Sequence, residues 1–229
     1  MRETEAQTRV EAREVSISAG GVFLKGDLAL PERARGVVLF AHGSGSSRHS
    51  PRNQFVAQRL QETGLATLLM DLLTLREEEE DARTARLRFD MGLLGRRLIA
   101  ALDWLAEDAR IRDRPVGCFG ASSGAGGALV AAAERPESIK AVVSRGGRPD
   151  LAGDSLPRVQ APTLLIVGSH DTAVIEMNRQ ALERLRCVKE LVIVPGASHL
   201  FEEPGTLEVV AKLAAAWFIR YLPPHEPSV

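Results

Sequence analysis

Short apolar runs alternate with longer amphipathic segments along most of this chain. The runs contain almost no polar residue, which predicts strands buried on both faces, and the segments between them carry apolar residues at helical spacing. The strands expected after an initial hairpin are residues 36–43, 65–71, 114–120, 140–147, 163–169 and 189–196. The expected helices are residues 51–63, 90–109, 124–135, 174–187 and 206–222.

The chain opens with two stretches of alternating residues, 14–19 and 22–30, on either side of Gly20 and Gly21. This pattern predicts a β-hairpin, which would add antiparallel strands at one edge of a sheet. The regular alternation of strands and helices that follows predicts an α/β fold with a mostly parallel, eight-stranded sheet and helices on both faces.

One domain is expected, spanning residues 13–222. Residues 1–12 are polar and are expected to be frayed, and residues 223–229 form a Pro-rich tail. Residues 144–160, which separate Val143 from Ala161, are too few for an inserted lid domain, so we expect an open, shallow site.

The composition narrows the functional classes. A net charge of −1 gives no electrostatic footprint for nucleic acid or for an anionic membrane. Cys118 and Cys187 lie far apart, which suits neither a metal site nor a disulfide framework. The chain shows no signal-peptide pattern and no membrane-spanning run, so we expect a cytoplasmic protein without metal or organic cofactor.

The stretch "GCFGASSGAG" follows an expected strand and precedes an expected helix. A nucleophile elbow, G-x-S-x-G, requires small residues two before and two after its serine, because the turn is very sharp. Ser122 has Gly120 and Gly124 in those positions, whereas Ser123 has two alanines. We therefore predict Ser122 as the nucleophile; the alternative is a plain tight turn.

A serine nucleophile needs a base and a carboxylate that orients the base. His199 follows the last expected strand and Asp171 follows the one before it, so both lie in loops at the carboxyl edge of the sheet. We predict these two as base and orienter. The second choices are His170 as base and Asp150 as orienter. His42 is expected to shape its loop by hydrogen bonding, and Asp71 is expected to have a structural role. The alternative role for Asp171 is to cap the helix that follows it.

An oxyanion needs preorganised backbone donors. One is expected at Ser123, directly after the nucleophile, and the other at Ser44 in the glycine-rich loop "HGSGS". This loop lacks the lysine of a phosphate-binding P-loop, which argues against a nucleotide site.

The motifs "HGSG", "GASSG", "VGSHD" and "GASHLF" occur in the order found in the α/β-hydrolase superfamily, which the chain resembles from Arg13 to Leu222. It is similar to the dienelactone-hydrolase-related group, and more narrowly to hydrolase domains that are fused in some proteins to a phosphoribosyltransferase. The resemblance implies an α/β-hydrolase fold and hydrolase activity. Dienelactone hydrolases proper carry cysteine at the elbow, so Ser122 favours ester hydrolysis over the dienelactone route.

The sequence therefore predicts a serine hydrolase of small carboxylic esters; a non-catalytic binding module and an acyltransferase or perhydrolase remain alternatives. Arg48, Arg145 and Arg148 are candidate contacts for an anionic substrate, or else they tie the loops together. The acidic run at 77–81 is expected to be a solvated loop or helix start. The apolar face of the last expected helix either covers the sheet, as in a monomer, or serves as the interface of a homodimer.

Overall fold

The computed structural model describes residues 9–224 and contains an eight-stranded sheet in the order β1-β2-β4-β3-β5-β6-β7-β8. Strands β3 to β8 run parallel, and β1 and β2 are antiparallel to their neighbours. The strands are β1 (Val10–Ala19), β2 (Val22–Pro31), β3 (Gly36–Ala41), β4 (Leu65–Met70), β5 (Val116–Ala121), β6 (Ile139–Arg145), β7 (Thr163–Gly168) and β8 (Lys189–Val194). The expected α/β-hydrolase architecture is confirmed.

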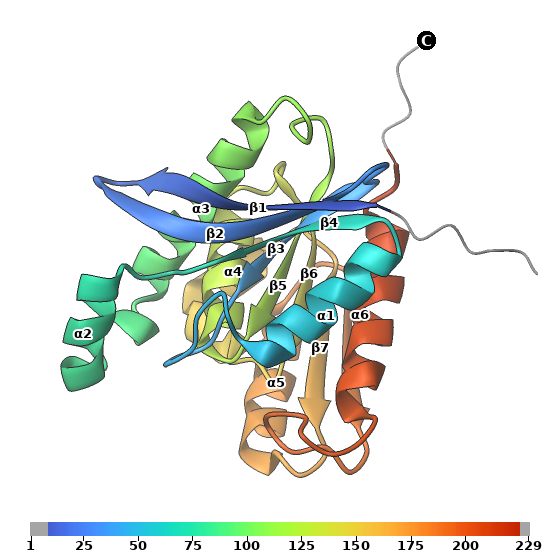
Figure 1. The fold of residues 1–229 in the computed structure, drawn as a ribbon. Helices are drawn as coiled ribbons and strands as arrows, with labels where there is room; N and C mark the ends of the chain where they lie inside the picture. The colour runs from blue at the N-terminus through green and yellow to red at the C-terminus, as the bar shows by residue number, and fades with distance from the viewer. Residues whose placement is uncertain (1–8, 225–229) are drawn as a thin grey trace, which may run out of the picture.

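Helices cover both faces of this sheet (Figure 1). One face packs against α1 (Pro51–Glu62) and α6 (Thr206–Tyr221), around Phe40, Phe119 and Phe218. The other packs against α3 (Met91–Glu107) and α4 (Ser123–Glu134), and α5 (Thr172–Arg184) lies beside the 3₁₀ segment η2 (Pro149–Arg158). Because residues 146–162, with η2 as their helical segment, form the connection between β6 and β7, no lid domain is inserted there among the described residues.

Strand β1 begins four residues before residue 14, where the sequence pattern predicts its start. Residues 10–12 were expected to be frayed, but they pair with residues 29–31 of β2. Their side chains are exposed, so the sequence carries no burial pattern to reveal the strand; the backbone ladder and an ion pair between Glu11 and Arg110 hold these residues. Residues 1–8 and 225–229, which include the other part of the predicted frayed end and most of the predicted Pro-rich tail, lie outside the described residues.

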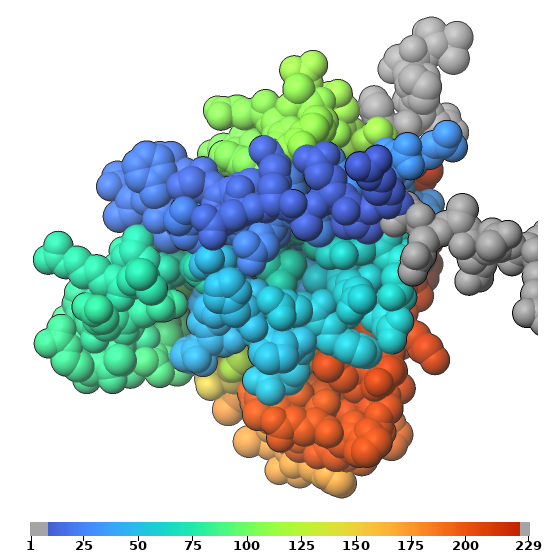
Figure 2. All heavy atoms as spheres, viewed as in Figure 1, coloured from blue at the N-terminus to red at the C-terminus, as the bar shows by residue number. Residues whose placement is uncertain are grey.

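The acidic run at 77–81 lies in a helix, α2 (Leu75–Thr84), which is followed by the short segment η1 (Leu87–Phe89). Thr74 and Glu77 form a capping box at its start. Glu77 is paired with the buried Arg97 at 2.7 Å, and Asp81 accepts hydrogen bonds from Arg88. The atoms of α2 form a lobe against the loop that leads into α1 (Figure 2).

Candidate active site

Ser122 stands at the turn from β5 into α4, with backbone angles of φ 50° and ψ −125°. Few non-glycine residues adopt a positive φ, and those that do often sit at functional sites. A Cβ at Gly120 would lie 2.4 Å from the Cα of Ala125, and one at Gly124 would lie 2.3 Å from the carbonyl oxygen of Ala41. This close packing explains why both positions are glycine, as the prediction of Ser122 at the elbow requires. Ser123, in contrast, is buried in the first turn of α4.

Asp171 and His199 are joined directly. The Nδ1 of His199 lies 2.5 Å from Oδ2 of Asp171, so the imidazole donates this hydrogen bond and its Nε2 is free for other contacts. Gly146, with φ 50°, lets the end of β6 approach this pair, because a Cβ there would lie 2.9 Å from the carbonyl oxygen of His199. Glu203 accepts a hydrogen bond of 3.0 Å from the amide of Ser198, which holds the turn that carries the histidine.

Ser122 and His199 line the same cavity of about 230 Å³, which we call the Ser122 cavity. Its wall is formed by the loop after β3, the first turn of α1 and the carboxyl ends of β5 and β6. The three residues predicted for the triad therefore meet at one edge of the sheet, although they come from three separate loops.

The other histidine and aspartate candidates have structural contacts. His42 is buried, its Nδ1 donates to the carbonyl of Gly43 and its Nε2 accepts from the amide of Leu72. Burial lowers its pKa, so it remains neutral and fixes the loop, as predicted. Asp71 and Asp150 are each paired with an arginine. The side chain of His170 is exposed.

Ser44 and Ser123 are brought together, with their Oγ atoms 2.9 Å apart. Within residues 9–224, neither backbone amide donates a hydrogen bond to a protein acceptor. Gly43 permits this approach, since a Cβ there would lie 2.8 Å from the Cβ of Ser122. Two free amides beside the elbow serine are the arrangement an oxyanion hole requires.

A second cavity, of about 460 Å³, shares Ser44 with the Ser122 cavity and is lined by Ser123 as well. We call it the leucine cavity, because Leu72, Leu73 and Leu94 contribute its apolar lining. Residues of α2 complete it, among them Glu78, whose pKa is raised by burial and by the nearby Asp71. The sequence did not reveal this cavity, because no motif marks where α2 folds against the loop after β3.

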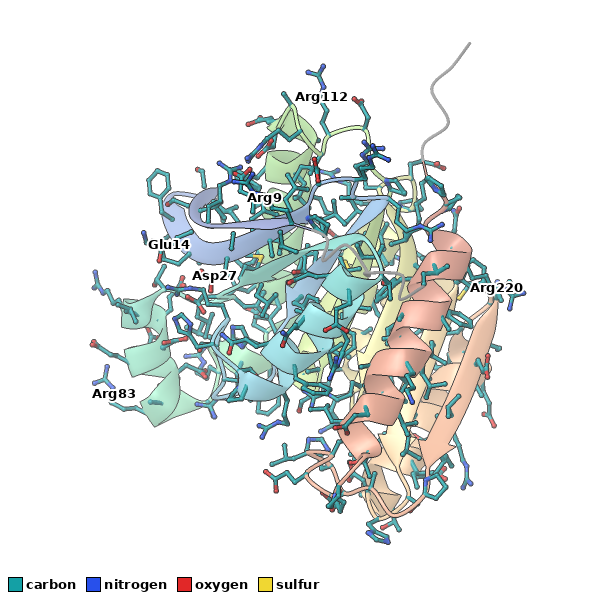
Figure 3. All side chains as sticks on the ribbon, turned by 45° about the vertical axis from the view of Figure 1, so that its right-hand side comes forward. Arg9, Glu14, Asp27, Arg83, Arg112 and Arg220 are labelled. Carbon is teal, nitrogen blue, oxygen red and sulfur yellow. The ribbon has the colours of Figure 1, made fainter. Side chains whose placement is uncertain are left out.

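The three predicted arginines differ in their surroundings. Arg48 is paired with Asp71, Asp27 and Glu14; the latter two lie side by side on the hairpin (Figure 3). Arg148 is paired with Asp150 at 2.8 Å. Neither lines the Ser122 cavity or the leucine cavity, so these two tie loops together, which was the alternative prediction.

Arg145, in contrast, lines the Ser122 cavity. Arg52, in the first turn of α1, lines it as well and was missed by the sequence analysis. The sequence did contain a signal for Arg52. The helix expected after the loop that follows β3 places its first side chains at the carboxyl edge of the sheet.

Other reactive groups do not reach the site. Cys118 is fully buried in β5, and burial raises the pKa of its thiol to about 12. Among the described residues, no group of three histidine, cysteine or acidic side chains is placed to hold a metal ion. The same part of the chain contains no helix with the length and apolar character needed to cross a bilayer.

Comparison with known proteins identifies relatives among the dienelactone hydrolases. Residues 24–219 match the model of the dienelactone hydrolase family. A dienelactone hydrolase structure from Anabaena variabilis is 62% identical with a TM-score of 0.91, and the match covers 93% of this chain and 99% of that one. The structure of Est1E from Butyrivibrio proteoclasticus shares the fold at 16% identity, with a TM-score of 0.76 and coverage of 91% and 98%.

A Mycobacterium tuberculosis protein named as a phosphoribosyl transferase is 57% identical over 215 residues. The match covers 94% of this chain but 48% of that protein, so the chain spans about half of the relative's length.

Proposed function

The chain belongs to the dienelactone hydrolase family, and we propose that it is a serine hydrolase that cleaves carboxylic esters through an acyl-serine intermediate. The observation that supports this best is the strained elbow serine in the same cavity as a histidine whose other ring nitrogen is bound by Asp171. Cys118 is no substitute nucleophile, since its thiol is fully buried and protonated.

In the proposed reaction, Ser122 Oγ attacks the ester carbonyl while His199 accepts the hydroxyl proton through Nε2. Asp171 keeps the imidazole in the required tautomer and stabilises its protonated form. The amides of Ser44 and Ser123 stabilise the tetrahedral oxyanion, each contributing about 10²–10³-fold to the rate. His199 then donates the proton to the leaving alcohol, and water releases the acid from the acyl-serine by the same steps.

The two cavities suggest how an ester lies across the site. His199 lines the Ser122 cavity and is not part of the leucine cavity. Since His199 must protonate the leaving oxygen, we place the alcohol part in the Ser122 cavity. The acyl part then extends past Ser44 into the leucine cavity, where Leu72, Leu73 and Leu94 would pack against a short hydrocarbon chain and the polar lining would face its far end.

We do not extend phosphoribosyl transfer to this chain, because the chain matches only 48% of the relative with that name and its own residues 24–219 match the dienelactone hydrolase family.

Fluorophosphonate labelling followed by peptide mass spectrometry tests the nucleophile. We expect an adduct on Ser122, its loss in Ser122→Ala and its retention in Ser123→Ala, which removes the neighbouring hydroxyl as a matched control. Hydrolysis of short-chain esters should disappear with the label. A folded wild-type protein that neither reacts with the fluorophosphonate nor hydrolyses esters would support the binding-module alternative. Acyl transfer to an added alcohol in preference to water would support the acyltransferase alternative.

A further inference from the structure

Arg145, the last residue of β6, is a buried cation without a carboxylate partner among the described residues. The residue is 6% exposed, and within residues 9–224 its side chain makes one hydrogen bond, from Nη2 to Oδ1 of Asn53 at 3.2 Å. In the same part of the chain its Nε has no hydrogen-bond partner. Burial lowers the pKa of the guanidinium to about 10, because the charged form is poorly solvated there. Burying an unpaired charge destabilises a fold, and an anionic ligand in the adjoining cavity would compensate that cost.

The position of Arg145 relates this cation to the proposed reaction. Its carbonyl oxygen accepts a hydrogen bond from the amide of Ser122, so the two residues are neighbours on adjacent strands. Both line the Ser122 cavity. Arg48 and Arg148 show the contrast, since each of them is neutralised by carboxylates and lies outside that cavity.

The rest of the Ser122 cavity adds positive potential. The N-terminus of the twelve-residue helix α1 borders it, with Ser50 as N-cap and no acidic residue in the first turn. Arg52 contributes a second guanidinium, which is held loosely at the rim by Glu202 at 3.5 Å. Among the residues that the structure describes, no aspartate or glutamate lines the cavity. A helix N-terminus and two guanidinium groups together form a strong site for an oxyanion.

We propose that the Ser122 cavity binds a phosphate group carried on the alcohol part of the ester, so that the protein deacylates phosphorylated alcohols. A phosphate monoester carries a charge of about −1.5 to −2 at pH 7 and offers three acceptor oxygens, which matches two guanidinium groups better than the single charge of a carboxylate does. The alcohol part is assigned because this cavity also contains His199, so the inference rests on the proposed function.

The phosphate takes no part in the bond changes. The bond between the acyl carbon and the alcohol oxygen breaks, a bond from that carbon to Ser122 Oγ forms, and His199 transfers the serine proton to the leaving oxygen. Water then hydrolyses the acyl-serine. The products are a carboxylic acid and the free phosphorylated alcohol, with the phosphate ester bond intact.

Three butanoyl esters that differ only in the alcohol test the proposal: those of 2-hydroxyethyl phosphate, 3-hydroxypropanoate and 2-methoxyethanol. We expect kcat/KM to be highest for the phosphate ester. The ratio of its kcat/KM to that of the neutral methoxyethyl ester should fall about ten- to a hundredfold in Arg145→Met and in Arg52→Met, as loss of a hydrogen bond to a charged group implies. Arg59→Met removes the same charge from the exposed last turn of α1, and all three rates should stay unchanged.

A second measurement covers the case in which the buried Arg145→Met variant does not fold. Inorganic phosphate should inhibit hydrolysis of the neutral ester competitively, and Arg52→Met, a partly exposed position, should weaken that inhibition by a similar factor.

A wild-type preference for the neutral or the carboxylate ester, or a selectivity ratio unaffected by Arg52→Met, would overturn the phosphate proposal while ester hydrolysis stands. Absence of both ester turnover and fluorophosphonate labelling in the folded protein would instead reject the proposed function itself.

Discussion

The strain at Ser122 leads to a testable expectation about stability. Its φ of 50° with ψ of −125° lies outside the regions that a residue with a Cβ adopts readily, whereas glycine tolerates it. Within residues 9–224 the Ser122 side chain makes no hydrogen bond, so removal of its hydroxyl costs little. Ser122→Gly relieves the strain and Ser122→Ala retains it, and both abolish the nucleophile.

The expected size follows from two opposing contributions. A non-glycine residue in such a conformation costs about 1–3 kcal/mol of folding free energy. Glycine makes the unfolded chain more flexible, which costs about 0.4–1 kcal/mol relative to alanine. The glycine variant should therefore be more stable than the alanine variant by about 1 kcal/mol, or about 2–4 °C in Tm for a chain of this size.

Urea denaturation followed by circular dichroism measures this difference, and equal m-values would establish that the comparison is between similar transitions. A glycine variant less stable than the alanine variant by about 0.5–1 kcal/mol would refute the reasoning, because that is the ordinary result at an unstrained position.

Three further outcomes are expected. His199→Ala should lower kcat for ester hydrolysis by at least about 10³-fold, and His170→Ala should not. The opposite order in steady-state assays would show that His170, not His199, is the base. Gly124→Ala should destabilise the fold by about 1–3 kcal/mol in urea, because its Cβ would lie 2.3 Å from a carbonyl oxygen of β3, while Gly92→Ala on α3, which meets only flexible side chains, should not. Hydrogen bonds from Arg110 lower the pKa of Asp108 from 3.8 to about 2. The stability that the ionised carboxylate provides is therefore present above pH 4 and is lost as the pH falls towards 2. Asp108→Asn should remove that part of the pH dependence of unfolding, which urea denaturation at several acidic pH values would measure.

The fold was predictable where burial on both faces leaves a continuous apolar run. Strands β3 to β7 lie under helices and are almost completely buried, whereas the edge strand β8 is only partly buried and still carries the apolar run 191–194. Residues 10–12 were missed because exposed side chains on an edge strand carry no such selection. The elbow was predictable because the requirement for Gly120 and Gly124 is local and imposed by a sharp turn.

The surroundings of the arginines were not predictable in the same way. Arg48 meets Glu14, Asp27 and Asp71, which come from three different strands or loops, so its neutralisation depends on the finished sheet. Arg145 stands in an ordinary strand pattern, and nothing in the sequence shows that no carboxylate approaches it. Motifs identify groups held by local geometry, whereas the charge balance of a site is a property of the tertiary structure.

The ion pairs of Arg48 also make the N-terminal hairpin part of the site. The loop after β3 carries Ser44, which lines both cavities and offers one of the two free amides. Arg48 anchors this loop through its amide, which donates to Oδ1 of Asp71 at 2.8 Å, and through its guanidinium, which contacts carboxylates on β1 and β2. An oxyanion donor must be fixed before the reaction to stabilise the transition state, because reorientation during the reaction would consume that stabilisation. In the proposed reaction the hairpin would therefore contribute by holding the Ser44 loop, although none of its described residues lines the Ser122 cavity.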